Sequence, residues 1–223
     1  MTNLILTERR RPKKTFKKGS KMKTKKHLKS KKIYKKCKDK EISCQKDLVL
    51  ELLRDTNFPK NVSRKNIFRT DQNSYEGFVL GKINLIPHMW KKTKHRINGK
   101  MVTKIKKQQQ SNRTSDPKFK KLYLETKKLM KMHDPKYKFT TIQYNKNMRA
   151  ARHVDGRNVG VSYIVGLGTY TGGELIVYDN DKKPTNPVKN DLHKTFYSFN
   201  GSKFLHEVAP FKGERYTIVF FKI

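Results

Sequence analysis

Residues 138–223 contain five short runs rich in β-branched and aromatic residues, and this pattern constrains the fold more than any other feature of the chain. The runs are KFTTIQYN (138–145), VGVSYIVGL (159–167), GELIVYD (173–179), TFYSFN (195–200) and RYTIVFFKI (215–223). Glycine, asparagine, aspartate and proline separate them, which is typical of strands joined by turns. The pattern predicts an antiparallel β-sandwich or barrel, with a tight hairpin corner at Gly172–Gly173.

Charge divides the chain into regions of different character. The net charge is +36, but residues 150–223 carry only +3, whereas residues 1–46 carry +16 and residues 47–149 carry +17. A segment as basic as residues 1–46 has little apolar surface to bury, and we predict a disordered tail. We therefore divide the chain into a basic tail (1–46), a helical or mixed region (47–137) and a β core (138–223).

The middle region contains apolar patterns of its own. KDLVLELLRDT (46–56) and DPKFKKLYLETKKLMKMH (116–133) predict helices, the second starting near Pro117. GFVLGKINL (77–85) predicts a strand, and residues 91–114 read as a basic loop. About 90 residues with this charge hold little core of their own, so we expect the helices to pack on the β core. The predicted fold class is α+β.

The excess of positive charge predicts an anionic partner. Nucleic acid, with DNA favoured, fits best because neutralised phosphates release condensed counterions. No stretch reaches the roughly 18 apolar residues of a membrane span, and the N-terminus lacks the apolar segment of a secretory signal. Cys37 and Cys44 have no second pair with which to form a zinc site. We expect a monomer inside the cell, nuclear if the host is eukaryotic, without a membrane partner.

Candidate metal ligands lie just before the second run. His153 and Asp155 are two residues apart, so in extended chain both side chains point to the same face. His206 in GSKFLHEVAPFKGER is the strongest candidate for a third ligand. Two histidines and one carboxylate leave three positions open, as in non-haem Fe(II) oxygenases. Arg215, nine residues further on, is suited to holding a carboxylate by two parallel hydrogen bonds.

The stretches HVDGRNVGVS, GTYTGGEL and FLHEVAPFKGERY together resemble the Fe(II)/2-oxoglutarate-dependent dioxygenases, and most closely the TET/JBP group of nucleic-acid base hydroxylases. The resemblance covers about residues 138–223. It implies a double-stranded β-helix (jelly-roll) core in which His153, Asp155 and His206 hold Fe(II). It also implies that Arg215 binds the distal carboxylate of 2-oxoglutarate, that Tyr144 and Asn145 contact this co-substrate, and that O2 is consumed. The expected reaction is hydroxylation of the 5-methyl group of thymine or 5-methylcytosine.

Several alternatives stay open at this point. Asn158 and Ser162 match polar positions of the family pattern and could orient the substrate, or could be an ordinary turn asparagine and strand serine. A prolyl or lysyl protein hydroxylase would share the same core and the same three ligands, as would an AlkB-like demethylase. The alternative outside the enzymes is a basic DNA-packaging protein with an inactive jelly roll.

Overall fold

A computed structural model describes residues 41–62, 67, 74–179 and 185–223. Residues 1–40, which make up most of the predicted basic tail, lie outside the described residues. The helical elements are α2 (Ile42–Asp55), η2 (Pro87–Met89), α3 (Asn112–Ser115) and α4 (Pro117–His133). The strands are β1 (Lys60–Asn61), β2 (Tyr75–Asn84), β3 (Lys91–Ile97), β4 (Lys100–Lys106), β5 (Gln108–Gln110), β6 (Thr141–Lys146), β7 (Ser162–Gly172), β8 (Leu175–Val177), β9 (Val188–Asn190), β10 (Phe196–Phe199), β11 (His206–Val208) and β12 (Phe211–Phe221).

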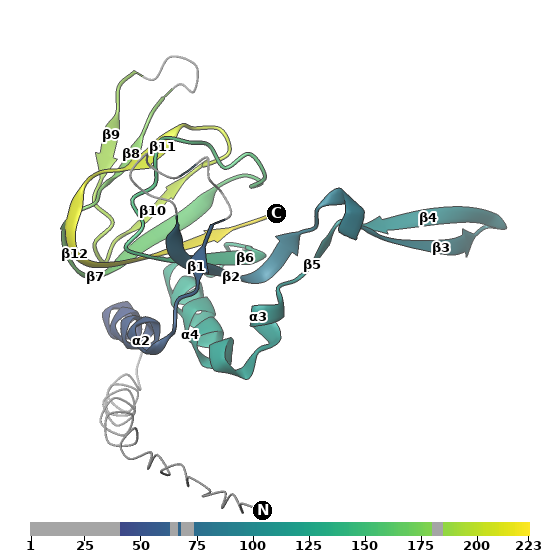
Figure 1. The fold of residues 1–223 in the computed structure, drawn as a ribbon, viewed down its shortest axis with the longest axis horizontal. Helices are drawn as coiled ribbons and strands as arrows, with labels where there is room; N and C mark the ends of the chain where they lie inside the picture. The colour runs from purple at the N-terminus through teal and green to yellow at the C-terminus, as the bar shows by residue number, and fades with distance from the viewer. Residues whose placement is uncertain (1–40, 63–66, 68–73, 180–184) are drawn as a thin grey trace, which may run out of the picture.

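Two antiparallel sheets form the core (Figure 1). The larger sheet has the order β1-β2-β6-β12-β7-β10, with β5 pairing the end of β2, and the smaller sheet has the order β11-β8-β9. β12 is central because it pairs with β6 on one side and, over ten residues, with β7 on the other. A pocket lies between the sheets, lined by residues of both. This arrangement is consistent with the predicted jelly roll.

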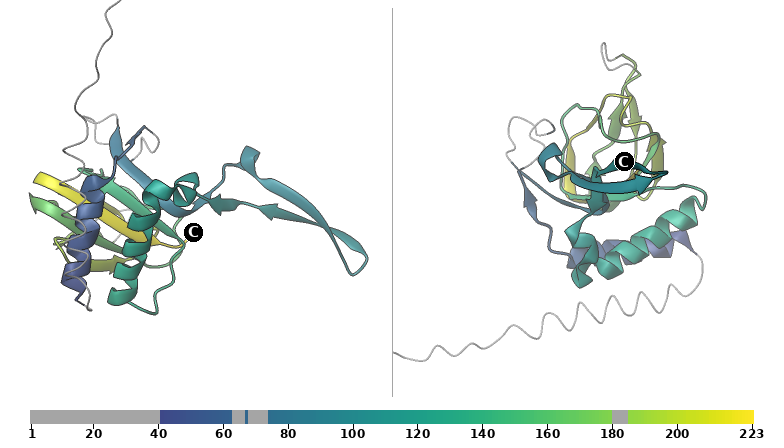
Figure 2. Two further views of the ribbon diagram at one scale, coloured as in Figure 1. Left: turned by 90° about the horizontal axis from the view of Figure 1, so that it is seen from below. Right: turned by 90° about the vertical axis from the view of Figure 1, so that its right-hand side faces the viewer.

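The helices cover the outer face of the larger sheet. Figure 2 shows α2 and α4 side by side across its strands. Leu53 of α2 and Leu129 of α4 are buried in the same core cluster as Ile218 and Phe220 of β12. The helices of the middle region therefore pack on the β core as expected, because one core cluster contains residues of both. α4 begins as predicted, with Pro117 in its first turn and the Asp116 carboxylate accepting a hydrogen bond from the Lys118 backbone NH.

The prediction of a basic loop over residues 91–114 was wrong. Residues 91–106 form the β3–β4 hairpin, and β5 and α3 follow it. The turn residues Asn98 and Gly99 have φ values of 47° and 78°, which suit a two-residue hairpin turn. Part of the signal was readable in the sequence, since Asn-Gly is a residue pair that two-residue hairpin turns favour. The large number of lysines concealed it.

Three features of the fold differ from the sequence predictions or add to them. α2 begins at Ile42, so residues 42–46 belong to a helix and not to the tail. Gly172–Gly173 does not join two paired strands, because β7 and β8 belong to different sheets. Both glycines have positive φ and turn the chain from one sheet to the other. The polar segment between β8 and β10 contains the short strand β9.

Cys44 of α2 is disulfide-bonded in the structure. Cys37 lies outside the described residues. None of the helices within the described ranges has both the length and the apolar character to cross a membrane.

Candidate metal centre and pocket

The predicted ligands come together although they lie up to 53 positions apart in the chain. A single antiparallel bridge joins His153 to His206 at the start of β11, and each backbone NH donates to the other residue's carbonyl oxygen at 2.9 Å. The Asp155 NH donates to the carbonyl oxygen of Gly201 at 2.7 Å. These backbone contacts fix the segment before β7 against the smaller sheet, and so they place all three side chains on the same side.

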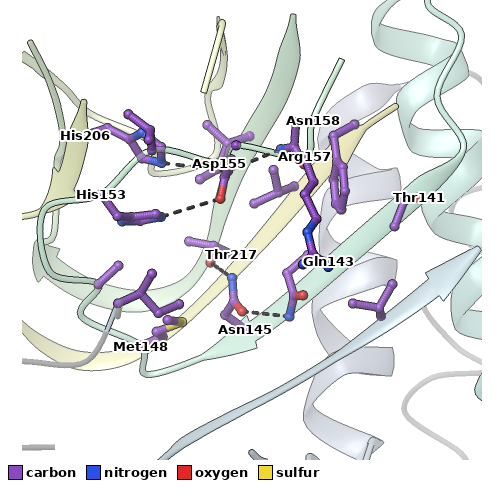
Figure 3. A pocket seen from close by; sticks show the side chains of 18 of the residues that line it. Thr141, Gln143, Asn145, Met148, His153, Asp155, Arg157, Asn158, His206 and Thr217 are labelled. Carbon is purple, nitrogen blue, oxygen red and sulfur yellow. Dashed lines mark hydrogen bonds and ion pairs between the residues drawn. The ribbon is translucent and has the colours of Figure 1, made fainter. Parts of the chain in front are cut away.

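The geometry of the three side chains suits one metal ion. Nε2 of His153 lies 3.7 Å from Oδ1 of Asp155, and Nε2 of His206 lies 3.9 Å from Oδ2 of the same carboxylate. The ligand atoms all lie within 4.8 Å of one another. Figure 3 shows the two imidazoles facing the Asp155 carboxylate across one side of the pocket. The sequence expectation that these three residues converge is confirmed.

Backbone contacts on the far side of each ring favour metal binding. Nδ1 of His153 lies 2.7 Å from the carbonyl oxygen of Ala151, and Nδ1 of His206 lies 3.0 Å from that of Phe204. A carbonyl oxygen can only accept, so each Nδ1 carries the proton and each Nε2 presents a lone pair. Metal-binding histidines are commonly oriented in this way.

Asn158 orients the carboxylate ligand. Its Nδ2 donates to Oδ2 of Asp155 at 3.2 Å, and its backbone NH donates to the Asp155 carbonyl oxygen. Asn158 is a pocket-lining residue. The turn that the sequence allowed is present, and it places the Asn158 amide against the Asp155 carboxylate. A role of Asn158 in orienting the substrate stays a prediction.

Arg215 is a buried cation within the wall of the pocket. It is only 1% exposed, and its Nη atoms donate to the backbone carbonyl oxygens of Gly173 at 2.8 Å and Met148 at 3.4 Å. Burial lowers the pKa of the guanidinium, although arginine stays charged in proteins. Within the described part of the chain, no carboxylate forms an ion pair with Arg215. A buried charge of this kind needs an anion, which an incoming carboxylate group would supply.

Gly173 makes room for this arginine. A Cβ at position 173 would lie 2.8 Å from Nε and 3.0 Å from Cδ of Arg215. The φ of Gly173, +75°, is also one that other residues rarely adopt. The last glycine of the GTYTGGEL segment therefore allows the chain to turn and leaves room for the Arg215 side chain.

Alternation along two neighbouring strands separates pocket residues from core residues. In β6, Thr141, Gln143 and Asn145 line the pocket, and in β12 Thr217 follows Arg215 on the same face. Asn145 donates through Nδ2 to Thr217 Oγ1 at 3.1 Å and accepts from Gln143 Nε2 at 2.9 Å (Figure 3). Sequence reasoning missed Gln143 and Thr217, although a period of two counted from Asn145 and Arg215 indicates both.

The same alternation removes Tyr144 from the site, and the expectation that it contacts the co-substrate was wrong. Its side chain is fully buried on the helix-covered face of the sheet, where it stacks on Phe78 with ring centroids 4.9 Å apart. Burial raises the pKa of its hydroxyl. Ser162 is also buried, and its Oγ has no hydrogen-bond partner among the described residues. It is not one of the pocket-lining residues.

The residues present fit Fe(II), 2-oxoglutarate and O2. Two imidazoles and one carboxylate form the three-ligand set of non-haem Fe(II) oxygenases and leave coordination positions for the co-substrate and oxygen. Arg215 offers a cation to a carboxylate in the same pocket. The pocket has a volume of about 840 Å³, within the range of small-molecule sites.

Comparisons with known proteins give similar folds only. No family model matches the chain, and no curated protein matches it. An oxidoreductase of the 2OG-Fe(II) oxygenase family from Burkholderia pseudomallei is 16% identical over 60% of this chain and 73% of its own, with a TM-score of 0.38. A Pseudomonas putida prolyl-4-hydroxylase is 14% identical over 82% of this chain and 87% of its own, with a TM-score of 0.43. OsALKBH1 is 10% identical over 82% of this chain and 93% of its own, with a TM-score of 0.46. These values are too low to transfer a residue's role.

Proposed function

We propose that this chain is an Fe(II)/2-oxoglutarate-dependent dioxygenase that hydroxylates a nucleic-acid base, with the 5-methyl group of thymine or 5-methylcytosine in DNA as its target. One observation carries the first part of the proposal. The ligand set His153, Asp155 and His206 and the buried cation Arg215 line the same pocket. Each feature alone is common. Together, three converging metal ligands and a buried cation that forms no ion pair with a described carboxylate match an anionic co-substrate that also binds the metal.

In this mechanism the protein binds and orients the metal and the co-substrate, and it excludes water from the site. His153, Asp155 and His206 would hold Fe(II), and Arg215 would hold the distal carboxylate of 2-oxoglutarate, supported by the polar side chains of Asn145 and Thr217. With O2, the bound iron and co-substrate supply the oxidising chemistry that places a hydroxyl on a C–H bond and leaves succinate and CO2. Backbone contacts to both imidazoles keep Nδ1 protonated.

A nucleic-acid substrate is supported by charge and by the pocket. Lys82 and Arg157 are among the pocket-lining residues, and Figure 3 shows the Arg157 side chain extending alongside Gln143. A base within a duplex cannot reach a site between two sheets, so the target base would be flipped out or taken from a single strand. Phosphates flanking that base would then meet the two cations near the pocket.

Mass spectrometry of nucleosides tests this function. The chain is incubated with genomic DNA, Fe(II), 2-oxoglutarate and ascorbate, and we expect a 5-hydroxymethyl nucleoside to form while succinate accumulates. His206→Ala should abolish both products, and it should also abolish the weak visible absorption of the anaerobic Fe(II)–2-oxoglutarate complex. His193→Ala is the matched control, because that imidazole contacts the Gly168 carbonyl oxygen away from the metal ligands.

The other functions predict different products. Succinate formation stimulated by peptides, with DNA inert, would replace the proposal with a protein hydroxylase. Formaldehyde released from N-methylated bases would replace it with a demethylase. An Fe(II) and 2-oxoglutarate titration without visible absorption would indicate an inactive jelly roll in a DNA-packaging protein.

A further inference from the structure

The β3–β4 hairpin, residues 91–106, projects from the body of the molecule, and we call it the arm. Among the strands that the structure describes, β3 and β4 pair with each other alone, over seven residue pairs from Lys91–Lys106 to Ile97–Lys100. Figures 1 and 2 show it extending well beyond both sheets and both long helices. Every residue of β3 and β4 is exposed. An isolated two-stranded ribbon is marginally stable in water, so a chain that keeps one this exposed has a use for its surface.

The arm is strongly cationic on both faces. Side chains directly opposite in the register share a face. One face carries Lys92, Lys94 and Arg96 in a row along β3, and consecutive members of that row are spaced about 6.7 Å apart by the strand rise. The other face carries Lys91, Lys100, Lys104 and Lys106. Residues 91–106 contain no aspartate or glutamate, and none of the described carboxylates elsewhere forms an ion pair with the arm.

Apolar side chains lie between these cations. Ile97, Met101, Val102 and Ile105 are 41–60% exposed. A purely electrostatic tether would not need them. A ribbon that presents cations to phosphates and apolar groups to sugars and thymine methyl groups matches the interior of a DNA groove.

The base of the arm is fixed at the edge of the pocket. Lys82, Ile83 and Asn84 at the end of β2 line the pocket, and the pairing of β2 with β5 ends at Asn84 and Gln108. One further hydrogen bond, 2.8 Å long, runs from the Leu85 NH to the Lys107 carbonyl oxygen. It holds together the two chain segments that lead into the arm.

Trp90 packs where the β2–β5 ladder meets the arm. Its Nε1 donates to the Leu85 carbonyl oxygen at 3.0 Å, and Nζ of Lys107 lies 4.7 Å from the ring centroid. DNA bound along the arm would therefore be held beside the opening of the pocket.

We propose that the arm binds double-stranded DNA by lying in the major groove, with its two cationic faces contacting phosphates on the two walls. The B-form major groove, about 12 Å wide, admits a two-stranded β-ribbon. The deep, narrow major groove of A-form RNA does not, which favours DNA. The inference rests on the proposed function only in taking DNA as the partner, and binding is measured without turnover.

Fluorescence anisotropy with a labelled DNA duplex and the full-length chain tests the proposal. The arm variant is Lys92→Ser/Lys94→Ser/Arg96→Ser. The control, Lys120→Ser/Lys128→Ser/Lys131→Ser, removes the same charge from exposed positions on α4. We expect the arm variant to bind at least about tenfold more weakly near 0.1 M salt and to reduce the slope of log K against log salt by about 2–3. The control should change both by much less.

A second variant separates loss of the arm from misfolding. Replacing residues 86–106 by Asn-Gly closes β2 onto β5 with a two-residue turn. It should lose duplex affinity while keeping the Fe(II)–2-oxoglutarate absorption. Unchanged duplex binding in both arm variants, or equal loss in the α4 control, would overturn the proposal. So would arm-dependent binding to duplex RNA or to an acidic peptide in preference to DNA.

The two proposals fail in different ways. If arm variants lose duplex binding but no DNA nucleoside is ever hydroxylated, the arm binds DNA and the proposed reaction is wrong. If DNA is hydroxylated and the arm variants bind and turn over duplex normally, the proposed reaction stands and the arm proposal is wrong.

Discussion

In His153 and in His206, the hydrogen bond made by Nδ1 determines whether Nε2 is available to bind a metal. Each Nδ1 faces a backbone carbonyl oxygen, so each Nε2 presents a lone pair beside the Asp155 carboxylate. The same logic applies to Arg215, whose two carbonyl contacts satisfy donors without neutralising its charge. In both cases backbone carbonyl oxygens orient a side chain that lines the pocket.

Gly173→Ala tests how closely the Arg215 position depends on one missing methyl group. The new Cβ would lie 2.8 Å from Nε of Arg215, so we expect binding of 2-oxoglutarate to weaken, by about tenfold if the lost interaction is worth about 1.4 kcal/mol. Isothermal titration under anaerobic conditions measures the affinity. Gly99→Ala is the control, since its φ of +78° imposes the same backbone strain with nothing within 4 Å of the Cβ. Both variants should lose about 1–2 kcal/mol of stability, but only the first should lose affinity. Equal affinities in the two would show that Arg215 does not hold the co-substrate.

At the scale of elements, β12 connects the helix layer to the pocket. Tyr216, Ile218 and Phe220 pack in the core beneath α2 and α4, while Arg215 and Thr217 line the pocket. An ion pair adds a polar link, because Arg54 Nε of α2 lies 2.9 Å from Glu214 Oε2 of β12. Although partial burial opposes ionisation, the hydrogen bonds from Arg54 and Tyr216 hold the pKa of Glu214 below its ordinary value.

This link predicts a pH-dependent contribution to stability. Because the folded-state pKa of Glu214 is lowered, its stabilisation is fully present above about pH 4.5 and is lost as the pH falls through the lowered value. The pair is about a third exposed, so we expect at most about 1 kcal/mol. Urea unfolding of wild type and Glu214→Gln should differ near pH 7 and converge near pH 3. A constant difference across that range would assign the effect to packing.

At the scale of the molecule, the metal centre joins segments that the fold brings together from different parts of the chain. His153 and Asp155 lie in the loop before β7, His206 begins β11, and Arg215 belongs to β12. A ligand that contacts all of these binds the folded chain and not the unfolded one. Binding must therefore raise the free energy of unfolding.

Ligand addition should raise the melting temperature in two steps. A ligand at one hundred times its Kd adds about 2.7 kcal/mol, which corresponds to roughly 5–11 °C for a domain of this size. Anaerobic differential scanning calorimetry should show one increase with Fe(II) and a further increase with 2-oxoglutarate. His206→Ala should lose the first, and Gly173→Ala should keep the first and lose about half of the second, as a tenfold weaker affinity requires. An Fe(II)-dependent increase that survives in His206→Ala would place the metal elsewhere.

Much of this protein follows from local sequence pattern. Short runs rich in β-branched and aromatic residues predicted most core strands, Pro117 marked the start of α4, and Asn98–Gly99 held a hairpin signal that the surrounding lysines concealed. These features depend on neighbours a few residues apart, so the sequence alone determines them. The placement of Tyr144 in the core and Asn145 in the pocket depends on which face of β6 the helices cover, and only the tertiary structure decided that. The meeting of His153 with His206, the burial of Arg215 against the Gly173 carbonyl and the position of the arm at the edge of the pocket likewise depend on strand register between distant segments.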